Sequence, residues 1–325
     1  MRLGLIGCGR AAERLYLPAL AHVEGVRLAA VCDVSAQRRQ EIASRVPGCV
    51  AAESVPAMLD ATELDAVAVL TPPELHLDAA QPALARGLAV LIEKPLAATL
   101  EQAQAIAEAA SAGEAPVMLA FNRRWWTPVR RLADAARGLG GPVEIESVFI
   151  SDAQQWSPLC GVRDPLDDLA SHHLDLLAVV TGQPVAAVAA SPDADGGVTI
   201  ACDLADGSKA RVFTAQRAQT VEWMKVRRGG AAFRLDMGSV RVSPATGPVR
   251  RGLDFADRVA RKLARRPSAM AMSYAHQLDA FRRVVDEAAP VPVGLDAGLQ
   301  VMRAIAATRR SLEDDGRVVT VEETA

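Results

Sequence analysis

A pair of glycines directly behind the first apolar run is the feature that most constrains this fold. Gly7-Cys8-Gly9-Arg10-Ala11-Ala12 fits the pattern G-x-G-x-x-G/A and follows the apolar run Arg2 to Ile6. Gly7 permits a tight turn between strand and helix, Gly9 lets the backbone approach a ligand, and Ala12 allows the helix to pack closely on the strand. A helix that starts there directs free N–H groups and the positive end of its dipole at an anion. The pattern therefore predicts a strand, turn and helix that bind phosphate.

An acidic residue at the end of the second apolar run completes the sequence pattern of a dinucleotide-binding unit. Asp33 ends the second apolar run, near the offset of about 20 residues at which a carboxylate binds the adenosine ribose. Such a carboxylate also repels a 2′-phosphate, which favours NAD over NADP. Arg38 and Arg39 follow closely and keep NADP as an alternative. Cofactor contacts are assigned to Gly7, Gly9, Arg10, Ala11 and Asp33.

Residues 1–121 alternate short apolar runs with helix-period stretches, which predicts a Rossmann domain with a doubly wound parallel sheet. Strands are expected at Arg2 to Ile6, Val26 to Asp33, Ala66 to Leu70, Ala89 to Ile92 and Val117 to Ala120. Helices are expected between them, including Leu75 to Arg86 before Gly87, and Leu100 to Ala112 between Thr99 and Gly113. This domain would carry the cofactor.

Residues 122–325 show a different pattern, which predicts an α+β domain with an open, mainly antiparallel sheet. Period-2 segments lie at Val198 to Asp203, Lys209 to Thr214, Glu222 to Arg228 and Ala232 to Asp236. Helices are expected around Val129 to Arg137 and at Asp167 to Thr181, Ala269 to Glu287 and Leu295 to Asp315. The chain is therefore expected to fold as two domains.

The composition narrows the choice of partners. Of 325 residues, 50% are hydrophobic and 23% are charged, which excludes a disordered chain. A formal net charge of −3 provides no basic field, so nucleic acid is not expected to bind. No apolar run approaches the roughly 20 residues that span a bilayer, so no membrane association is expected. The five cysteines lack zinc spacing and predict reduced thiols in a cytoplasmic protein; they are Cys8, Cys32, Cys49, Cys160 and Cys202.

Four further motifs carry a family resemblance. Glu93-Lys94-Pro95 follows the expected strand Ala89 to Ile92, Thr71-Pro72 with His76 precedes it, and Asn122-Arg123-Arg124 opens the second domain. The segment from Asp168 to Asp175 matches D-x-G-x-H-x-x-D except at Ala170, and Gly161 to Pro165 stands where a glycine-rich run is common. Nearly from end to end, the chain resembles the Gfo/Idh/MocA family of NAD(P)-dependent oxidoreductases.

The resemblance implies roles for the residues of these motifs. It adds cofactor contacts at Thr71, Pro72, His76 and Glu93, and it implies a catalytic set of Lys94, His172 and Asp168. His172 would be the general base for oxidation and the acid for reduction, because an ordinary imidazole pKa of about 6.5 suits proton exchange near neutrality. Lys94 would donate to the substrate oxygen and assist proton transfer, while Asp168 would orient a neighbouring hydroxyl.

The spacing of three ionisable residues along the expected helix would place them on the same helix face. Residues 168, 172 and 175 stand at i, i+4 and i+7 of the expected helix, so Asp168, His172 and Asp175 would project from one face. An ion pair or cap is the structural alternative. Metal binding is geometrically conceivable, but no further His or Cys cluster completes a ligand shell, so no metal is expected.

These patterns predict an enzyme that transfers a hydride between a nicotinamide and a hydroxyl or keto carbon of a sugar, a cyclic polyol or a sugar derivative. The alternatives are a reductase of a non-sugar carbonyl or imine, and a catalytically silent protein that senses nicotinamide. Trp125 and Trp126 would stack on a sugar ring or be buried, and the basic stretch Arg250 to Arg266 would contact phosphate or be solvated. The family implies a homodimer or homotetramer formed through the second domain's sheet.

Overall fold

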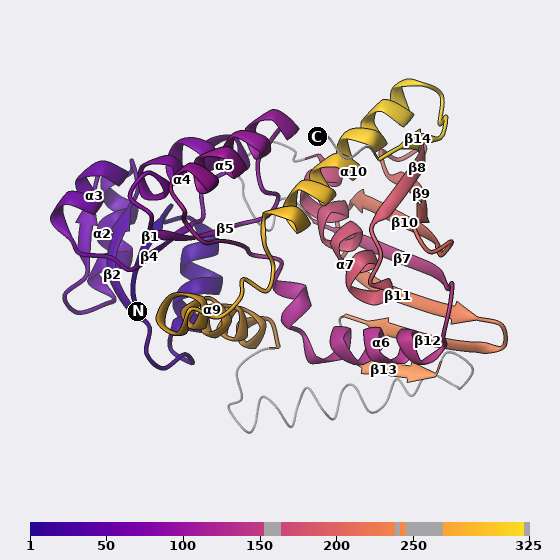
Figure 1. Cartoon of the computed structure of the whole chain (residues 1–325), viewed down its shortest axis with the longest axis horizontal. Helices are drawn as coiled ribbons and strands as arrows, with labels where there is room; N and C mark the ends of the chain where they lie inside the picture. The colour runs from indigo at the N-terminus through magenta and orange to yellow at the C-terminus, as the bar shows by residue number, and fades with distance from the viewer. Residues whose placement is uncertain (153–163, 238–240, 245–268, 322–325) are drawn as a thin grey trace. The chain divides into compact units, whose positions relative to one another are not determined.

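A computed structural model of the chain describes residues 1–152, 164–237, 241–244 and 269–321 (Figure 1). The chain divides into two compact units. Unit 1 contains Met1–Asn122 and Ala271–Met302, and unit 2 contains Arg123–Met270 and Arg303–Ala325. Each unit is built around its own sheet.

Unit 1 contains a six-stranded sheet in the order β3-β2-β1-β4-β5-β6, with every neighbouring pair parallel. The strands are β1 (Arg2–Ile6), β2 (Arg27–Cys32), β3 (Val50–Ala52), β4 (Ala66–Val69), β5 (Ala89–Ile92) and β6 (Val117–Leu119). All residues of β4 and β5 are buried, as expected for central strands covered on both faces. This confirms the predicted doubly wound sheet, and its strand order reverses between β1 and β4. The three-residue edge strand β3 was not predicted, because it is too short to show periodicity.

Three helices of unit 1 begin at a hydroxyl N-cap, of which Thr99 was predicted from the sequence. Ser35, Ser54 and Thr99 each accept a hydrogen bond from the backbone N–H three residues later, which satisfies a donor that the helix itself leaves unused. The elements are η1 (Ala12–Tyr16, a π-helix), α1 (Leu17–Leu20), α2 (Ala36–Ser44), α3 (Val55–Ala61), η2 (Pro73–Leu75), α4 (His76–Leu84) and α5 (Leu100–Ala112). The predicted bounds of α5 agree with the structure.

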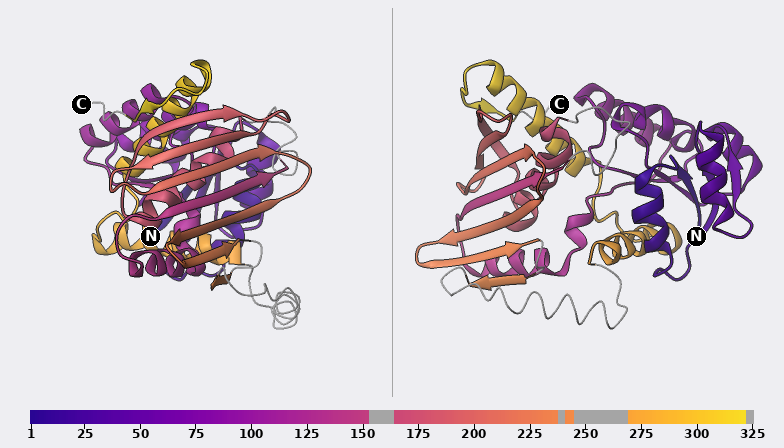
Figure 2. Two further views of the ribbon diagram at one scale, coloured as in Figure 1. Left: turned by 90° about the vertical axis from the view of Figure 1, so that its right-hand side faces the viewer. Right: turned by 180° about the vertical axis from the view of Figure 1, so that it is seen from behind.

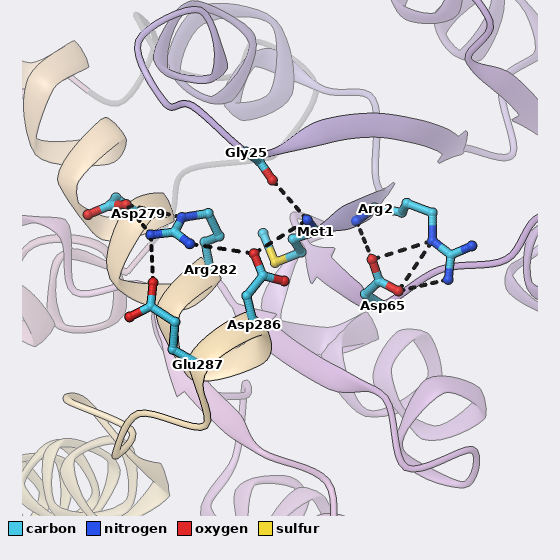
Figure 3. Close-up of polar contacts among 8 residues, drawn as sticks. All are labelled: Met1, Arg2, Gly25, Asp65, Asp279, Arg282, Asp286 and Glu287. Atoms are coloured by element: carbon cyan, nitrogen blue, oxygen red, sulfur yellow. Dashed lines mark hydrogen bonds and ion pairs between the residues drawn. The ribbon is translucent and has the colours of Figure 1, made fainter.

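Helix α9 (Ala269–Glu287) joins unit 1, which differs from the expected division of the chain at residues 121 and 122. Leu278 and Phe281 of this helix have no exposed surface. The Met1 ammonium lies 3.5 Å from the Asp286 carboxylate and donates to the Gly25 carbonyl at 2.8 Å (Figure 3). An amphipathic sequence shows that one face of a helix is buried but does not show which part of the chain covers it. The sequence therefore could not assign α9 to unit 1.

Charged side chains on α9 form a further network beside this contact. Arg282 pairs with Asp279 at 3.2 Å, with Glu287 at 3.1 Å and with Asp286 at 3.5 Å (Figure 3). These pairs are partly exposed, so they orient the helix more than they stabilise it. Helix α10 (Leu295–Glu313) follows and crosses from unit 1 to unit 2 after Met302.

Unit 2 contains an eight-stranded sheet in the order β13-β12-β11-β7-β10-β9-β8-β14. Only the pair β7 and β10 is parallel, so the sheet is mixed and mainly antiparallel, as predicted. The strands are β7 (Glu144–Ser151), β8 (Val185–Pro192), β9 (Val198–Leu204), β10 (Lys209–Gln216), β11 (Val221–Arg228), β12 (Ala231–Asp236), β13 (Arg241–Pro244) and β14 (Val319–Thr320).

Helices cover one face of this sheet and leave the other uncovered, as the left view of Figure 2 shows. They include α6 (Thr127–Gly138) and α7 (Ser171–Thr181), which follows the π-helical turn η5 (Leu166–Ala170). The single regular helix expected at Asp167 to Thr181 is therefore replaced by a π turn and an α-helix. Across the described ranges, no helix is long and apolar enough to cross a membrane.

Candidate active site

The glycine loop after β1 has the backbone that its sequence predicts. Gly7 has a φ of +102°, and a Cβ there would lie 2.9 Å from the Leu70 carbonyl carbon and 3.0 Å from the Thr71 nitrogen. A side chain at this position would therefore clash with the backbone after β4. A Cβ at Gly9, in contrast, would meet no atom within 4 Å. Ala12 has no exposed surface, which agrees with close packing of helix on strand.

Arg10 and Ala11 connect this loop to the π-helix η1, with Ala11 as its N-cap residue. A π turn carries i→i+5 hydrogen bonds and often marks a functional site. Tyr16 ends this turn and is completely buried.

Asp33, behind β2, is bound to the glycine loop. Its Oδ2 accepts a 2.8 Å hydrogen bond from the Cys8 backbone N–H, and its Oδ1 accepts one of the same length from the N–H of Ser35. The carboxylate is thus held at the carboxyl end of the sheet beside the loop. The guanidinium of Arg39 donates to the carbonyl oxygens of Asp33 and Val34, at 3.1 and 3.2 Å.

Thr71 and Pro72 follow β4, and His76 binds the loop that contains them. The His76 ring nitrogens lie 2.9 Å from the Thr71 carbonyl oxygen and 3.1 Å from that of Leu96. His76 has no exposed surface, and burial lowers the pKa of its imidazole. This residue connects two loops at the same edge of the sheet. The Thr71 hydroxyl is buried and has no hydrogen-bond partner within the described part of the chain.

Glu93 and Lys94 follow β5 and precede a cis peptide bond to Pro95. The Tyr16 hydroxyl donates to Glu93 Oε1 at 2.9 Å, and the Lys94 backbone N–H donates to Glu93 Oε2 at 3.1 Å. Gln277 of α9 donates to the Tyr16 oxygen at 3.4 Å. Glu93 is 9% exposed, so this carboxylate lies in the interior of unit 1, while the Lys94 side chain is half-buried.

His172 lies in unit 2, where an arginine contacts its imidazole. Arg123 Nη1 is 3.0 Å from His172 Nε2, and both residues are buried. The same guanidinium donates to both carboxylate oxygens of Glu222, at 2.5 and 3.1 Å. Burial by itself would raise the pKa of Glu222, but the charge of Arg123 and hydrogen bonds from His173 and Arg123 lower it to about 2. Glu222 is therefore ionised at neutral pH.

Aromatic and polar groups enclose this cluster. The Arg123 guanidinium lies 4.8 Å from the centroid of the Phe149 ring, which stacks on His173 at 5.3 Å. His173 Nδ1 lies 2.9 Å from the Ser147 hydroxyl, and its Nε2 lies 3.5 Å from Glu222. His173 has no exposed surface, and burial lowers the pKa of its imidazole, so it is a neutral structural residue.

Asp175 is paired with an arginine, which supports the structural alternative for this carboxylate. Arg124 donates from Nε to both Asp175 oxygens, at 2.9 and 3.0 Å, and from Nη2 at 2.5 Å. Asp175 is 2% exposed, and burial raises the pKa of its carboxyl despite the arginine.

Asp168 lies in the π turn η5, so its spacing to His172 is not that of a regular α-helix. The helix between them is therefore not the regular α-helix that was expected, because a π turn is wider, and the shared face of the two side chains stays a prediction. Arg309 of α10 anchors this turn by donating to Asp167 at 2.7 Å and to Asp164 at 2.9 Å. Within the described residues, no group of three or more His, Cys, Asp or Glu side chains could hold a metal ion.

Some contacts could not be assigned from the sequence. Arg123 was noted only as part of a motif, and Glu222 and Tyr16 carried no signal, since their partners are distant along the chain. Trp126 is 6% exposed, which favours the buried alternative for that residue. Cys160 and the basic stretch Arg250 to Arg266 lie outside the described residues, and the other four cysteines are free thiols.

Comparison with known proteins identifies the family. Residues 1–121 match the oxidoreductase family with an NAD-binding Rossmann fold that includes Gfo, Idh and MocA. The rhizopine catabolism protein MocA of Rhizobium meliloti is 32% identical over 237 residues, which cover 66% of this chain and 71% of that protein. The chain belongs to this family. Membership confirms the sequence-based expectation of an oxidoreductase with NAD as its cofactor.

Two further relatives extend over the whole chain. Inositol 2-dehydrogenase of Rhizobium meliloti is 25% identical over 348 aligned residues, covering 98% of both proteins. The crystal structure of scyllo-inositol dehydrogenase from Lactobacillus casei, with bound NAD(H) and scyllo-inositol, is 18% identical and superposes with a TM-score of 0.78 over 99% of both chains. The second likeness establishes the fold of this family member.

Proposed function

We propose that this family member transfers a hydride between NAD and a hydroxyl-bearing carbon of a cyclic polyol or sugar. The observation that carries the proposal is the link between the glycine loop and Lys94. Both follow strands that end at the same edge of the unit 1 sheet, near the reversal of strand order where α/β folds bind ligands. The hydrogen bond from Tyr16 to Glu93 joins the helix after the glycine loop to the segment that carries Lys94.

The residues at this edge fit a dinucleotide. No neighbouring atom of the protein requires a glycine at position 9, so the open space there suits a pyrophosphate. The Asp33 carboxylate is available for ribose hydroxyls, and the buried Thr71 hydroxyl offers an unused donor. Two exposed apolar side chains, Val34 after β2 at 93% exposure and Leu75 at the end of η2 at 49% exposure, suit an adenine ring. When bound, NAD would supply the nicotinamide carbon that accepts or returns the hydride.

The chain supplies groups for the oxygen of the reacting carbon. Loss of a hydride from a carbinol requires loss of the hydroxyl proton as well. As the family motifs imply, His172 is proposed to take this proton in oxidation and return it in reduction, Lys94 to donate to the substrate oxygen and assist the transfer, and Asp168 to orient a neighbouring hydroxyl. A cyclic polyol is favoured as substrate because a full-length relative is named an inositol dehydrogenase.

Absorbance of the reduced nicotinamide tests the proposal. The purified protein is offered inositols, sugars and keto-sugars with NAD or NADP, and Lys94→Ala is measured alongside with NAD affinity recorded separately. We expect turnover with NAD that Lys94→Ala abolishes while NAD still binds. Binding of NAD without turnover of any polyol, sugar or keto-sugar would favour the sensing alternative, and turnover of imines or simple carbonyls alone would favour the reductase.

A homo-oligomer is proposed to form through the uncovered face of the unit 2 sheet. Val148, Phe213 and Trp223 lie on this face and remain partly exposed, and Arg234 lies 4.3 Å from the centroid of the Trp223 ring. Partly exposed aromatic side chains on a broad sheet are typical of subunit contacts. Light scattering should give a dimer or tetramer, and Trp223→Glu should shift it towards the monomer. A monomeric wild-type protein would refute the proposal.

A further inference from the structure

His76 is a buried imidazole between two loops at the carboxyl edge of the unit 1 sheet. It is the first residue of α4 and has no exposed surface. Its Nε2 lies 2.9 Å from the Thr71 carbonyl oxygen, and its Nδ1 lies 3.1 Å from that of Leu96, two residues after Lys94. The loops follow β4 and β5, which are neighbours in the sheet. Because the ring is enclosed, it can influence the proposed reaction only through these loops.

Both contacts of the His76 ring are with acceptors. A carbonyl oxygen has no proton to give, so each contact becomes a hydrogen bond only when the ring nitrogen carries a proton. A neutral imidazole has one N–H and an imidazolium has two. A neutral ring therefore donates to one carbonyl, while the other carbonyl faces a nitrogen lone pair. Both loops are held at once only when the ring is doubly protonated.

The surroundings of His76 keep the ring neutral at neutral pH. Burial lowers its pKa below 6.5, although hydrogen bonds to backbone carbonyls and the negative charge of Glu74 act in the opposite sense. The ring also stands at the N-terminus of α4, where the helix dipole disfavours a positive charge. The charged side chains on the surrounding elements are Glu74 in η2, Asp78 in α4, Glu93 and Lys94 after β5, and Glu101 in α5. The second proton is therefore gained in acidic solution.

We propose that His76 is a positioning residue that holds the Thr71 loop with one proton on Nε2 and, on gaining a second proton, also holds the segment that carries Lys94. The single proton is assigned to the Thr71 contact because it is the shorter of the two. Glu93 already accepts from the Lys94 backbone N–H, so the hydrogen bond to Leu96 fixes the same segment from its other side. The inference rests on the proposed function for the role of Lys94, and it refines the cofactor contact expected for His76.

Nitrogen NMR of the wild-type protein observes both protons of the ring. The protein is labelled with 15N-histidine, and the His76 signals are assigned by their loss in His76→Gln. We expect a single proton on Nε2 at about pH 7.5 and a second proton on Nδ1 as the pH is lowered towards about 4.5. A neutral ring protonated on Nδ1, or a ring that stays neutral until the protein unfolds, would overturn the proposal.

Hydrogen exchange of the two loops tests what the ring holds. His76→Gln places an amide near Nε2 and keeps a donor to Thr71, but it cannot gain a second proton. Its exchange in peptides covering 70–75 and 94–98 should equal that of the wild type at about pH 7.5. Towards about pH 4.5, protection of 94–98 relative to the intrinsic rate should rise about two- to tenfold in the wild type alone, since one hydrogen bond contributes that much.

Two results would contradict this role. A structural imidazole would make His76→Gln differ from the wild type by the same factor at every pH. Protection of 94–98 that did not rise in the wild type would refute the second hold without any variant. His22→Gln is the matched control, because it makes the same substitution at an exposed imidazole of unit 1. It should keep the rise at 94–98, and loss of the rise there as well would remove the effect from His76.

Turnover connects this hold to the proposed reaction. We expect kcat of the wild type relative to His76→Gln to rise about two- to tenfold over the same pH range, while the ratio of their NAD affinities stays constant. A constant kcat ratio would refute the positioning of Lys94, even if the exchange results were as expected. Absence of turnover in the wild type would count against the proposed function alone, because the NMR and exchange measurements need no substrate and still decide the role of His76.

Discussion

The Tyr16 hydroxyl donates a 2.9 Å hydrogen bond to Oε1 of Glu93, although the two residues are 77 positions apart. Tyr16 ends the π turn behind the glycine loop, and Glu93 precedes Lys94. Gln277 adds a third segment by donating to the same phenol oxygen at 3.4 Å. Burial, and then the neighbouring Glu93 charge, raise the pKa of Tyr16, so the phenol keeps its proton and remains a donor. The cofactor loop and the lysine segment are thus connected within unit 1.

Tyr16→Phe removes this donor and keeps the aromatic ring. The buried Glu93 oxygen then lacks its partner, which should lower the free energy of unfolding by about 1–3 kcal/mol. Urea unfolding followed by circular dichroism measures the loss. Because Glu93 also accepts from the Lys94 N–H, we expect kcat to fall more than NAD affinity.

Ser44→Ala is the control for loss of a hydroxyl. Ser44 is exposed, and its hydroxyl donates to the Glu41 carbonyl of the same helix at 2.9 Å. Its stability should change by less than about 0.5 kcal/mol. If Ser44→Ala and Tyr16→Phe lowered the free energy of unfolding equally, the Tyr16–Glu93 hydrogen bond would contribute no more to stability than that of an exposed hydroxyl.

The two loop glycines should respond differently to alanine. Gly7→Ala forces a side chain onto a backbone with a φ of +102° and against the Leu70 carbonyl carbon at 2.9 Å, so it should cost about 2 kcal/mol or more. Gly9→Ala meets no protein atom and should leave stability within about 0.5 kcal/mol. It should nevertheless weaken NAD binding by about tenfold, or about 1.4 kcal/mol.

Thermal unfolding and NAD titration of both variants check this contrast. If Gly9→Ala left the NAD affinity unchanged, the space beside Gly9 would not be part of the proposed cofactor site. A fully stable Gly7→Ala would contradict the close approach of the backbones after β1 and β4.

Elements whose signals are local were predictable from the sequence. The helix Leu100–Ala112 shows its N-cap Thr99 and its end at Gly113, and the buried strand β5 and the part of β1 after Arg2 are continuous apolar runs. The mainly antiparallel sheet followed from period-2 segments in the same way. In contrast, the π turn at Leu166–Ala170 depends on tertiary packing, and no residue pattern marks it.

Contacts between distant residues account for most of what was missed at the candidate site. The guanidinium of Arg123 reaches Glu222 across 99 residues and His172 across 49. Nothing in the Glu222 segment distinguishes a buried carboxylate from a solvated one, since a single acidic residue at a strand start is common. The ionisable groups could therefore be proposed from motifs, but their pairing and protonation required the structure.

Burial should make three of the cysteines unreactive. It raises the pKa of Cys8 and Cys202 to about 12 and that of Cys32 to about 11, and only thiolates react readily. Iodoacetamide at about pH 8 should label these residues at least about tenfold more slowly in the folded protein than in urea. Mass spectrometry of the labelled peptides measures the rates. Rapid labelling of Cys8 would mean that the glycine loop exposes its thiol.

Two buried carboxylates of unit 2, Glu222 and Asp175, each pair with an arginine but should give opposite pH dependences of stability. Glu222 has its pKa lowered from 4.5 to about 2, so its contribution is present above about pH 5 and is lost as the pH falls through the folded value. Glu222→Gln should cost about 3–5 kcal/mol at neutral pH, because Arg123 stays buried without its anion. The difference between wild type and this variant should shrink towards low pH.

Asp175 should behave in the reverse sense. Burial raises the pKa of its carboxyl above 3.8, so the folded state holds the proton more tightly than the unfolded state does. The contribution of Asp175 is therefore greatest at low pH and is lost as the pH rises through the folded pKa. Urea unfolding of wild type, Glu222→Gln and Asp175→Asn from about pH 3 to about pH 7 measures both slopes. If the contributions of Glu222 and Asp175 changed with pH in the same direction, the charge of Arg124 would outweigh the burial of Asp175. Both carboxylates would then stay ionised because of their arginine partners.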